Sequence, residues 1–306
     1  MNRGWLSISV FVALAYALAW VVCLPLWLDP RQLGAPYALV CVVAMMFTPA
    51  IAAVLTLKLV ERRGWRELVE VLRLRLVQPP TRFLTWLGLA AAVIYLFVFA
   101  SLATSTLLGR FPFDPSMGGV AGLPGLPPGL PAYLLGVIML LSALLNGAIN
   151  TIPAAGEEIG WRGFLFPRLQ ERVGATGAVL IGGVIWGLWH APIVLLGYNY
   201  PLHPVLGLIA MCGMCVLVNG ALAWVCQRSG SVWPAAYGHG VLNALLGSAI
   251  IVFARPGASV DTLAGTLLGW SGWFVPALVV VVLLARRAYA PRGAPGPGVP
   301  RRSGIA

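Results

Sequence analysis

The side chains in this sequence that could carry acid–base chemistry are few, and they stand inside apolar stretches. Glu157 and Glu158 follow the uncharged stretch 132–156, His190 lies within GVIWGLWHAPIVLL, and His239 lies within PAAYGHGVLNALL. Carboxylates and imidazoles transfer protons near neutral pH, and moving them out of water is expensive unless they are paired or bonded. Their retention in apolar surroundings makes them candidates for a hydrolytic site.

Helical spacing brings some of these groups together. Residues four apart share a face of an α-helix, so Glu158 can pair with Arg162, and His239 and Asn243 point in the same direction from one helix. We therefore expect an ion pair that holds one glutamate in place, and two hydrogen-bonding side chains presented side by side.

The stretch around His190 has its own geometry. Trp186 precedes His190 by one helical turn, so its ring is expected to pack near the imidazole. Pro192 lacks an amide hydrogen and removes the hydrogen bond to Leu188, which predicts a bend close to the histidine.

The elements that must position these groups are membrane helices. The chain is 59% hydrophobic and 9% charged, with mean hydropathy +0.89, whereas soluble domains carry about 25% charged residues. A bilayer core needs about 20 apolar residues per helix, and eight stretches qualify: 6–28, 36–58, 83–108, 132–156, 178–197, 204–226, 235–253 and 264–285. The prediction is an all-α, polytopic membrane protein, a bundle of about eight transmembrane helices with the active site inside it.

The domain prediction follows from the same pattern. Residues 1–289 are expected to form one transmembrane domain whose motif core is 132–253, and residues 290–306, rich in Gly and Pro, a disordered cytoplasmic tail. The first apolar stretch is long enough to span, so we interpret it as an uncleaved helix rather than a signal peptide. The five cysteines do not suggest a disulfide framework.

Basic residues indicate the orientation. With the N-terminus inside, 17 Lys and Arg residues lie on the cytoplasmic side and three, Arg31, Arg110 and Arg255, lie outside. Lys and Arg concentrate in cytoplasmic loops, so both termini are predicted to be cytoplasmic, in what we expect to be a bacterial cell membrane. The net charge of +11 then reflects topology and attraction to the lipid bilayer, and no nucleic-acid partner is expected.

Simpler interpretations exist for each feature alone. A Glu–Arg pair is often an interfacial salt bridge. A histidine in a membrane helix is often a packing residue, and a His–Asn pair often makes a hydrogen-bonded contact between helices. Intramembrane polar groups also mark transport pathways, so a transporter or a non-proteolytic membrane scaffold is the alternative function. We favour an enzyme because most of the polar chemistry of the membrane interior gathers on three stretches.

In their order along the chain these motifs resemble those of a known family, the CPBP intramembrane proteases, which include type II CAAX prenyl endopeptidases and bacteriocin-processing or immunity proteins. The motifs that carry the resemblance are Glu157-Glu158-x-x-x-Arg162, Trp186-x-x-x-His190 and His239-x-x-x-Asn243. They cover 157–243, and the eight-helix layout extends the likeness over most of the chain. Trp186 is one departure, because phenylalanine is the usual aromatic residue at that position.

The resemblance implies a peptidase mechanism. Glu157 and His190 are similar to the pair that activates water in this family, and His239 and Asn243 would donate hydrogen bonds to the oxyanion. Arg162 would keep Glu158 ionised and fixed, which leaves Glu157 free to act as the base. The implied partner is a membrane-associated protein or peptide substrate; neither its identity nor the oligomeric state follows from the sequence.

The resemblance does not decide whether a metal takes part, because the family has been described both as metal-dependent and as glutamate-type. Glu157, His190 and His239 match the composition of a three-ligand zinc site, but HExxH spacing is missing from the motif. We therefore expect no tightly bound metal, with Zn²⁺ held by these three residues as the alternative.

Overall fold

The described part of the protein is helical. The computed structural model describes residues 3–121, 123 and 129–290, and within them it contains no strand, only one isolated bridge between Phe113 and Ala254. Apart from Ala290, the predicted tail lies outside the described residues. The all-α architecture predicted from composition is confirmed. The α-helices are α1 Arg3–Leu28, α2 Ala38–Met46, α3 Thr48–Leu59, α4 Trp65–Val71, α5 Pro80–Leu107, α6 Ala132–Glu158, α7 Phe166–Trp189, α8 Ala191–Val194, α9 Pro204–Ser229, α10 Trp233–Phe253 and α11 Phe274–Ala285.

Among the described residues, six helical segments are long and apolar enough to cross a membrane. They are Gly4–Leu28, Ala38–Leu59, Pro80–Leu107, Ala132–Trp189, Pro204–Ser229 and Trp233–Phe253. The fourth of these segments contains 58 residues and holds two of the predicted spans, 132–156 and most of 178–197. The protein is therefore an integral membrane protein with a helical bundle.

The last predicted span needs correction. Only its second half, α11, is helical, and at about 1.5 Å per residue its 12 residues are too short to cross a bilayer alone. The first half forms turns and the 3₁₀ helix Trp270–Gly272. Two serines of α5 satisfy part of this irregular backbone: Ser105 Oγ accepts the amide of Thr266, and Ser101 Oγ donates to the carbonyl of Gly272.

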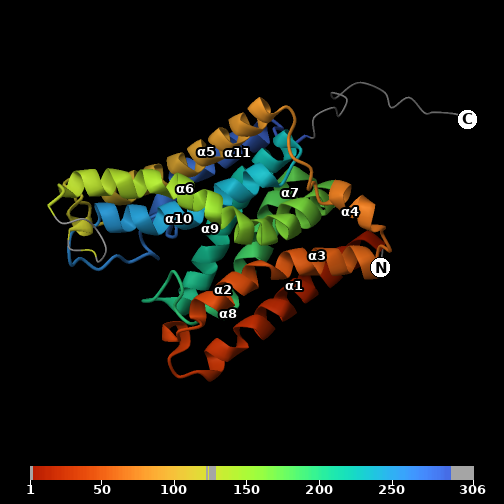
Figure 1. Ribbon diagram of the computed structural model, residues 1–306, viewed down its shortest axis with the longest axis horizontal. Helices are drawn as coiled ribbons and strands as arrows, with labels where there is room; N and C mark the ends of the chain where they lie inside the picture. The colour runs from red at the N-terminus through yellow and green to blue at the C-terminus, as the bar shows by residue number, and fades with distance from the viewer. Residues whose placement is uncertain (1–2, 122, 124–128, 291–306) are drawn as a thin grey trace, which may run out of the picture.

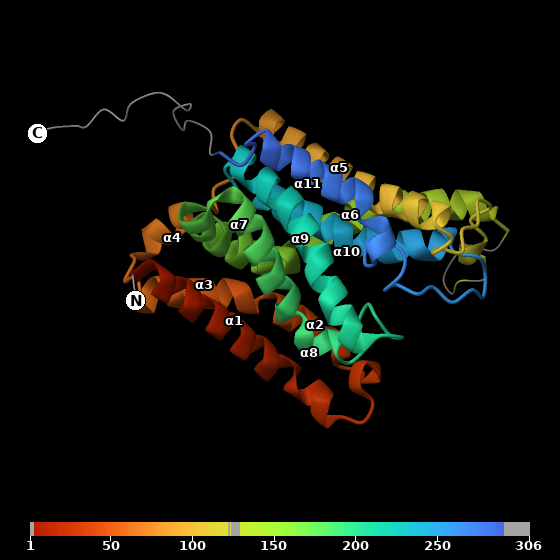
Figure 2. The same ribbon diagram turned by 180° about the vertical axis from the view of Figure 1, so that it is seen from behind.

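The helices form two groups that meet along α7 and α9. Both views show α5, α6, α10 and α11 lying together, whereas α1, α2 and α3 form the opposite side of the molecule (Figures 1 and 2). The N-terminus and α4 lie at one end of the bundle. The loops between α1 and α2, α8 and α9, and α10 and α11 lie at the other end.

The segment that follows α6 carries the first motif and is unusual in geometry. Ile159–Leu165 forms a π-helix that joins α6 to α7, and π-helical turns are frequent at functional sites. Gly160 has no Cβ, and this allows the segment to approach Pro49 closely. A Cβ built on Gly160 would lie only 2.4 Å from the Cβ of Pro49. Within α7, Gly174 has φ 72° and ψ 176°, and the helix changes direction there.

Candidate functional site

Glu158 lies at the centre of a buried polar network. Its Oε1 accepts hydrogen bonds from Arg162 Nη1 and from His239 Nδ1, both at 2.8 Å. The side chains of Glu158 and Arg162 are fully buried. The predicted Glu158–Arg162 pair is present, and a histidine from α10 joins it. Two donors on one oxygen fix this carboxylate, as charge-assisted hydrogen bonds do.

Glu157 has a different environment. Its Oε2 accepts a hydrogen bond from the indole Nε1 of Trp186 at 2.7 Å, while its Oε1 lies 3.9 Å from Nε2 of His239. The residue is 2% exposed and lines a pocket. One carboxylate oxygen is thus held by α7, and the other lies beside the histidine with no hydrogen bond among the described residues.

Trp186 connects the parts of the site. The guanidinium of Arg162 lies over its ring, 4.1 Å from the centroid. The ring of His239 stands edge-on to it, with centroids 5.3 Å apart. The carbonyl of Trp186 lies 2.9 Å from Nδ1 of His190. This residue therefore supports Glu157, the buried arginine and both histidines.

His190 stands at a break between helices. α7 ends at Trp189 and α8 begins at Ala191, so the helix is interrupted at the position where Pro192 predicts a bend. With Nδ1 directed to the carbonyl of Trp186, the other ring nitrogen is left for the pocket, whose wall includes this half-buried side chain. Within the described chain, no direct hydrogen bond joins His190 to Glu157.

His239 and Asn243 occupy different surroundings, although they are one turn apart on α10. His239 is 4% exposed and lies between the two glutamates. Asn243 is exposed and lines the pocket. Their shared helix face therefore runs from the buried network to the pocket wall.

The pocket at Glu157 has a volume of about 380 Å³. Three of the predicted site residues line it, namely Glu157, His190 and Asn243. Much of the remaining wall is apolar and includes Met45, Met46, Met211, Met214, Leu242 and Leu246. A carboxylate, an imidazole and an amide thus face an otherwise largely apolar cavity.

The predicted zinc ligands are not assembled as a metal site. In the described ranges there is no group of three or more His, Cys, Asp or Glu side chains placed to hold a metal ion. The side chains of Glu157, His190 and His239 are therefore not placed together as the ligands of a zinc ion.

Two features of the site were missed by sequence reasoning. The spacing of Trp186 and His190 predicts only a packed ring at Trp186, although the indole N–H is a donor that needs a partner inside the membrane. The contact between His239 and Glu158 joins residues 81 positions apart. The tryptophan in the second motif was a usable signal for the first feature, whereas nothing local in the sequence indicates the second.

Part of the chain matches a known protein family. Residues 135–245 match the family model of Rce1-like type II CAAX prenyl endopeptidases. The resemblance inferred from the three motifs is confirmed for that segment, which contains all six predicted site residues.

A curated relative has also been found. The chain is 39% identical over 49 residues to the CAAX prenyl protease 2 of Methanococcus maripaludis. This alignment covers 16% of the present chain and only 18% of the relative's length. The likeness is therefore concentrated in one short segment of both proteins.

Proposed function

We propose that this protein is an intramembrane endopeptidase that hydrolyses a peptide bond of a membrane-associated polypeptide. The observation that carries the proposal is the placement of Glu157: one carboxylate oxygen is held by Trp186, and the side chain lines a pocket whose wall also presents His190 and Asn243. The match to Rce1-like endopeptidases supports the reaction class.

In the proposed reaction, Glu157 is the general base. A water in the pocket, positioned with His190, gives a proton to the carboxylate as its oxygen attacks the carbonyl carbon of the scissile bond. The amide nitrogen then takes that proton from Glu157 as the C–N bond breaks. The products are a carboxylic acid and an amine, and Glu157 is again ionised; proton exchange between the products then gives a carboxylate and an ammonium, so atoms and charge balance.

The negative charge that develops on the carbonyl oxygen needs donors. Asn243 lies on the pocket wall and would donate through its amide, and His239, on the same face of α10, would donate from the deeper side. Glu158 and Arg162 act behind the site. Glu158 bonds to His239 and holds it in place, and Arg162 bonds to Glu158.

Comparative peptidomics of membranes tests the proposal. Membranes that carry the wild type should contain cleaved peptide termini that membranes with Glu157→Gln lack. Glu171→Gln is the matched control, since its carboxylate is 75% exposed and lies outside the pocket. A transporter or scaffold would give identical peptide termini in all three samples, and that result would refute the proposal.

A further inference from the structure

The pocket at Glu157 extends toward only one end of the bundle. Beyond Glu157 its wall is built from the first half of α9, the second half of α10 and the segments that follow α8 and α10. Residues from these parts include Met211, Met214, Leu246, Gly247, Ile250, Asn199 and Thr262. Both views place the loops that follow α8 and α10 at the end of the bundle away from the N-terminus and α4 (Figures 1 and 2).

This end carries few basic residues. Of the 17 Lys and Arg residues in the described part of the chain, only Arg31, Arg110 and Arg255 fall in segments at the pocket end; Arg162 is buried in the site, and the other 13 belong to segments toward the opposite end. Because Lys and Arg are concentrated in cytoplasmic loops, the pocket end corresponds to the non-cytoplasmic face of the membrane.

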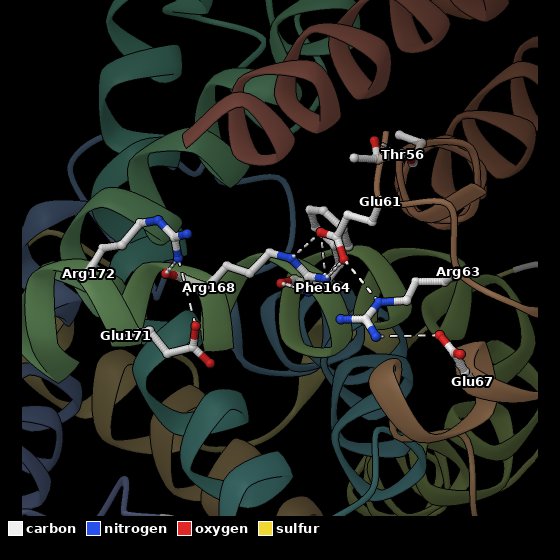
Figure 3. Close-up of polar contacts among 9 residues, drawn as sticks. Thr56, Glu61, Arg63, Glu67, Phe164, Arg168, Glu171 and Arg172 are labelled. Atoms are coloured by element: carbon white, nitrogen blue, oxygen red, sulfur yellow. Dashed lines mark hydrogen bonds and ion pairs between the residues drawn. The ribbon is translucent and has the colours of Figure 1, made fainter. Parts of the chain in front are cut away.

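At the basic end an ion pair joins two of the segments that surround the bundle. Arg168 Nη2 donates to both oxygens of Glu61, at 2.9 and 3.0 Å, and thereby ties the segment after α3 to α7 (Figure 3). The Arg168 guanidinium also covers the ring of Phe164, 3.8 Å from its centroid, and that phenylalanine is fully buried. A separate hollow at this end, lined by charged residues that include Glu61 and Arg168, shares no residue with the pocket at Glu157.

We propose that the site takes its substrate from the non-cytoplasmic side. The substrate would be a membrane-anchored or exported polypeptide that presents an extended, apolar segment to the outer half of the bilayer. This inference rests on the proposed function for the cleavage itself; for the direction of entry it rests on the position of the pocket, whose wall lies toward the end that is poor in basic residues.

The chemistry of the wall supports this class of substrate. Met45, Met46, Met211 and Met214 provide flexible, apolar contacts that adapt to side chains of different shape. At the outer part of the pocket the hydroxyl of Thr262 donates to the carbonyl of Asn199 at 2.6 Å, so the side-chain amide of Asn199 is the polar group offered to a peptide backbone. A polypeptide with apolar residues beside the scissile bond matches this distribution.

Cysteine labelling from each side of the membrane tests the direction of entry. Gly247→Cys is suited to it, because Gly247 is exposed and lines the pocket, and a Cβ there meets no atom within 4 Å. In a Cys212→Ala background, which removes the only native cysteine that is not buried, a membrane-impermeant maleimide is applied to spheroplasts and to inverted vesicles. We expect labelling at least fivefold stronger in spheroplasts.

Two exposed positions calibrate the orientation. Ser259→Cys, after α10, should label only in spheroplasts, and Arg66→Cys, in α4, only in inverted vesicles. Labelling of Gly247→Cys only in inverted vesicles, or in neither preparation, would overturn the inference. The inference would also be overturned if Ser259→Cys labelled only in inverted vesicles and Arg66→Cys only in spheroplasts, because the pocket would then face the cytoplasm.

An activity measurement separates this inference from the proposed function. Once a cleaved peptide has been identified, treatment of Gly247→Cys spheroplasts with the same reagent should reduce its formation at least tenfold. The Cys212→Ala protein treated in parallel should be unaffected. Labelling from outside with no cleavage product in any membrane would leave the direction of entry supported and refute the peptidase.

Discussion

The indole Nε1 of Trp186 donates a hydrogen bond of 2.7 Å to Oε2 of Glu157, although the two residues stand on different helices and 29 positions apart. Phenylalanine, the usual residue at this position in the family that the motifs resemble, could fill the same space but could not make this bond. The guanidinium of Arg162 on the ring of Trp186 further restricts the indole. The orientation of Glu157 is therefore set by α7.

The Trp186→Phe change tests the value of this bond. The smaller ring keeps most of the packing and the backbone contact to His190, but Oε2 of Glu157 loses its donor. Hydrogen bonds to charged groups contribute about 1.5–3 kcal/mol, so we expect kcat to fall on the order of tenfold or more while KM changes little. Steady-state kinetics on an identified peptide provide both values.

Trp273→Phe is the matched control for this experiment. Its indole Nε1 donates to the carbonyl of Leu267 at 2.9 Å, outside the pocket at Glu157. This variant loses a hydrogen bond of the same kind and should retain the kcat of the wild type. An unchanged kcat in Trp186→Phe would show that the indole is a packing residue only.

Local spacing allowed part of the site to be predicted from sequence. Glu158 and Arg162 are one helical turn apart, so their contact depends only on α6 continuing into a helical segment, which it does as a π-helix. The bend at His190 likewise follows from the missing amide hydrogen of Pro192. Such features need no knowledge of how the helices pack.

Contacts between helices could not be predicted in this way. The bonds from Trp186 to Glu157 and from His239 to Glu158 depend on how α7 and α10 pack against α6. The error at 264–285 has a similar origin. The composition of its first half is apolar enough for a span, but the turn there is stabilised by Ser101 and Ser105 of α5, which are distant in sequence.

Close packing at Gly160 gives a prediction about stability. A Cβ at this position would lie 2.4 Å from the Cβ of Pro49 and 2.7 Å from its carbonyl atoms. Overpacking costs about 1–3 kcal/mol, so Gly160→Ala should lower the thermal unfolding midpoint in detergent. Gly88→Ala in α5 is the control: a Cβ there meets nothing within 4 Å, and alanine is the better helix former. Equal midpoints for both variants would contradict the close contact.

The arrangement of ligands predicts the response to chelators. Because no metal site is assembled from Glu157, His190 and His239 in the described residues, cleavage should continue after incubation with 1,10-phenanthroline. The purified protein should contain zinc well below one equivalent, as measured by elemental analysis. Loss of activity on chelation that is restored by added Zn²⁺ would show that the three side chains rearrange around a metal.

The two adjacent glutamates should respond differently to removal of charge. Glu158→Gln leaves Arg162 buried without its counter-ion, and breaking a buried pair costs about 3–5 kcal/mol. Glu157→Gln retains an oxygen that can accept from Trp186, so the unfolding midpoint should stay near that of the wild type while cleavage is lost. Thermal unfolding in detergent measures the difference in stability between the two variants. A Glu157→Gln protein that is less stable than Glu158→Gln would reverse the two roles.

Removing both members of the buried pair completes the test. Glu158 and Arg162 are each 0% exposed and are joined at 2.8 Å, so Glu158→Gln and Arg162→Met should each leave an unpaired group in the bundle. In the double variant neither charge remains, and its midpoint should lie above that of Arg162→Met alone, since no uncompensated charge is left in the bundle. Cleavage should not recover, because His239 Nδ1 would still lack the carboxylate that orients it. Additive losses of stability in the double variant would show that the two residues do not act as a pair.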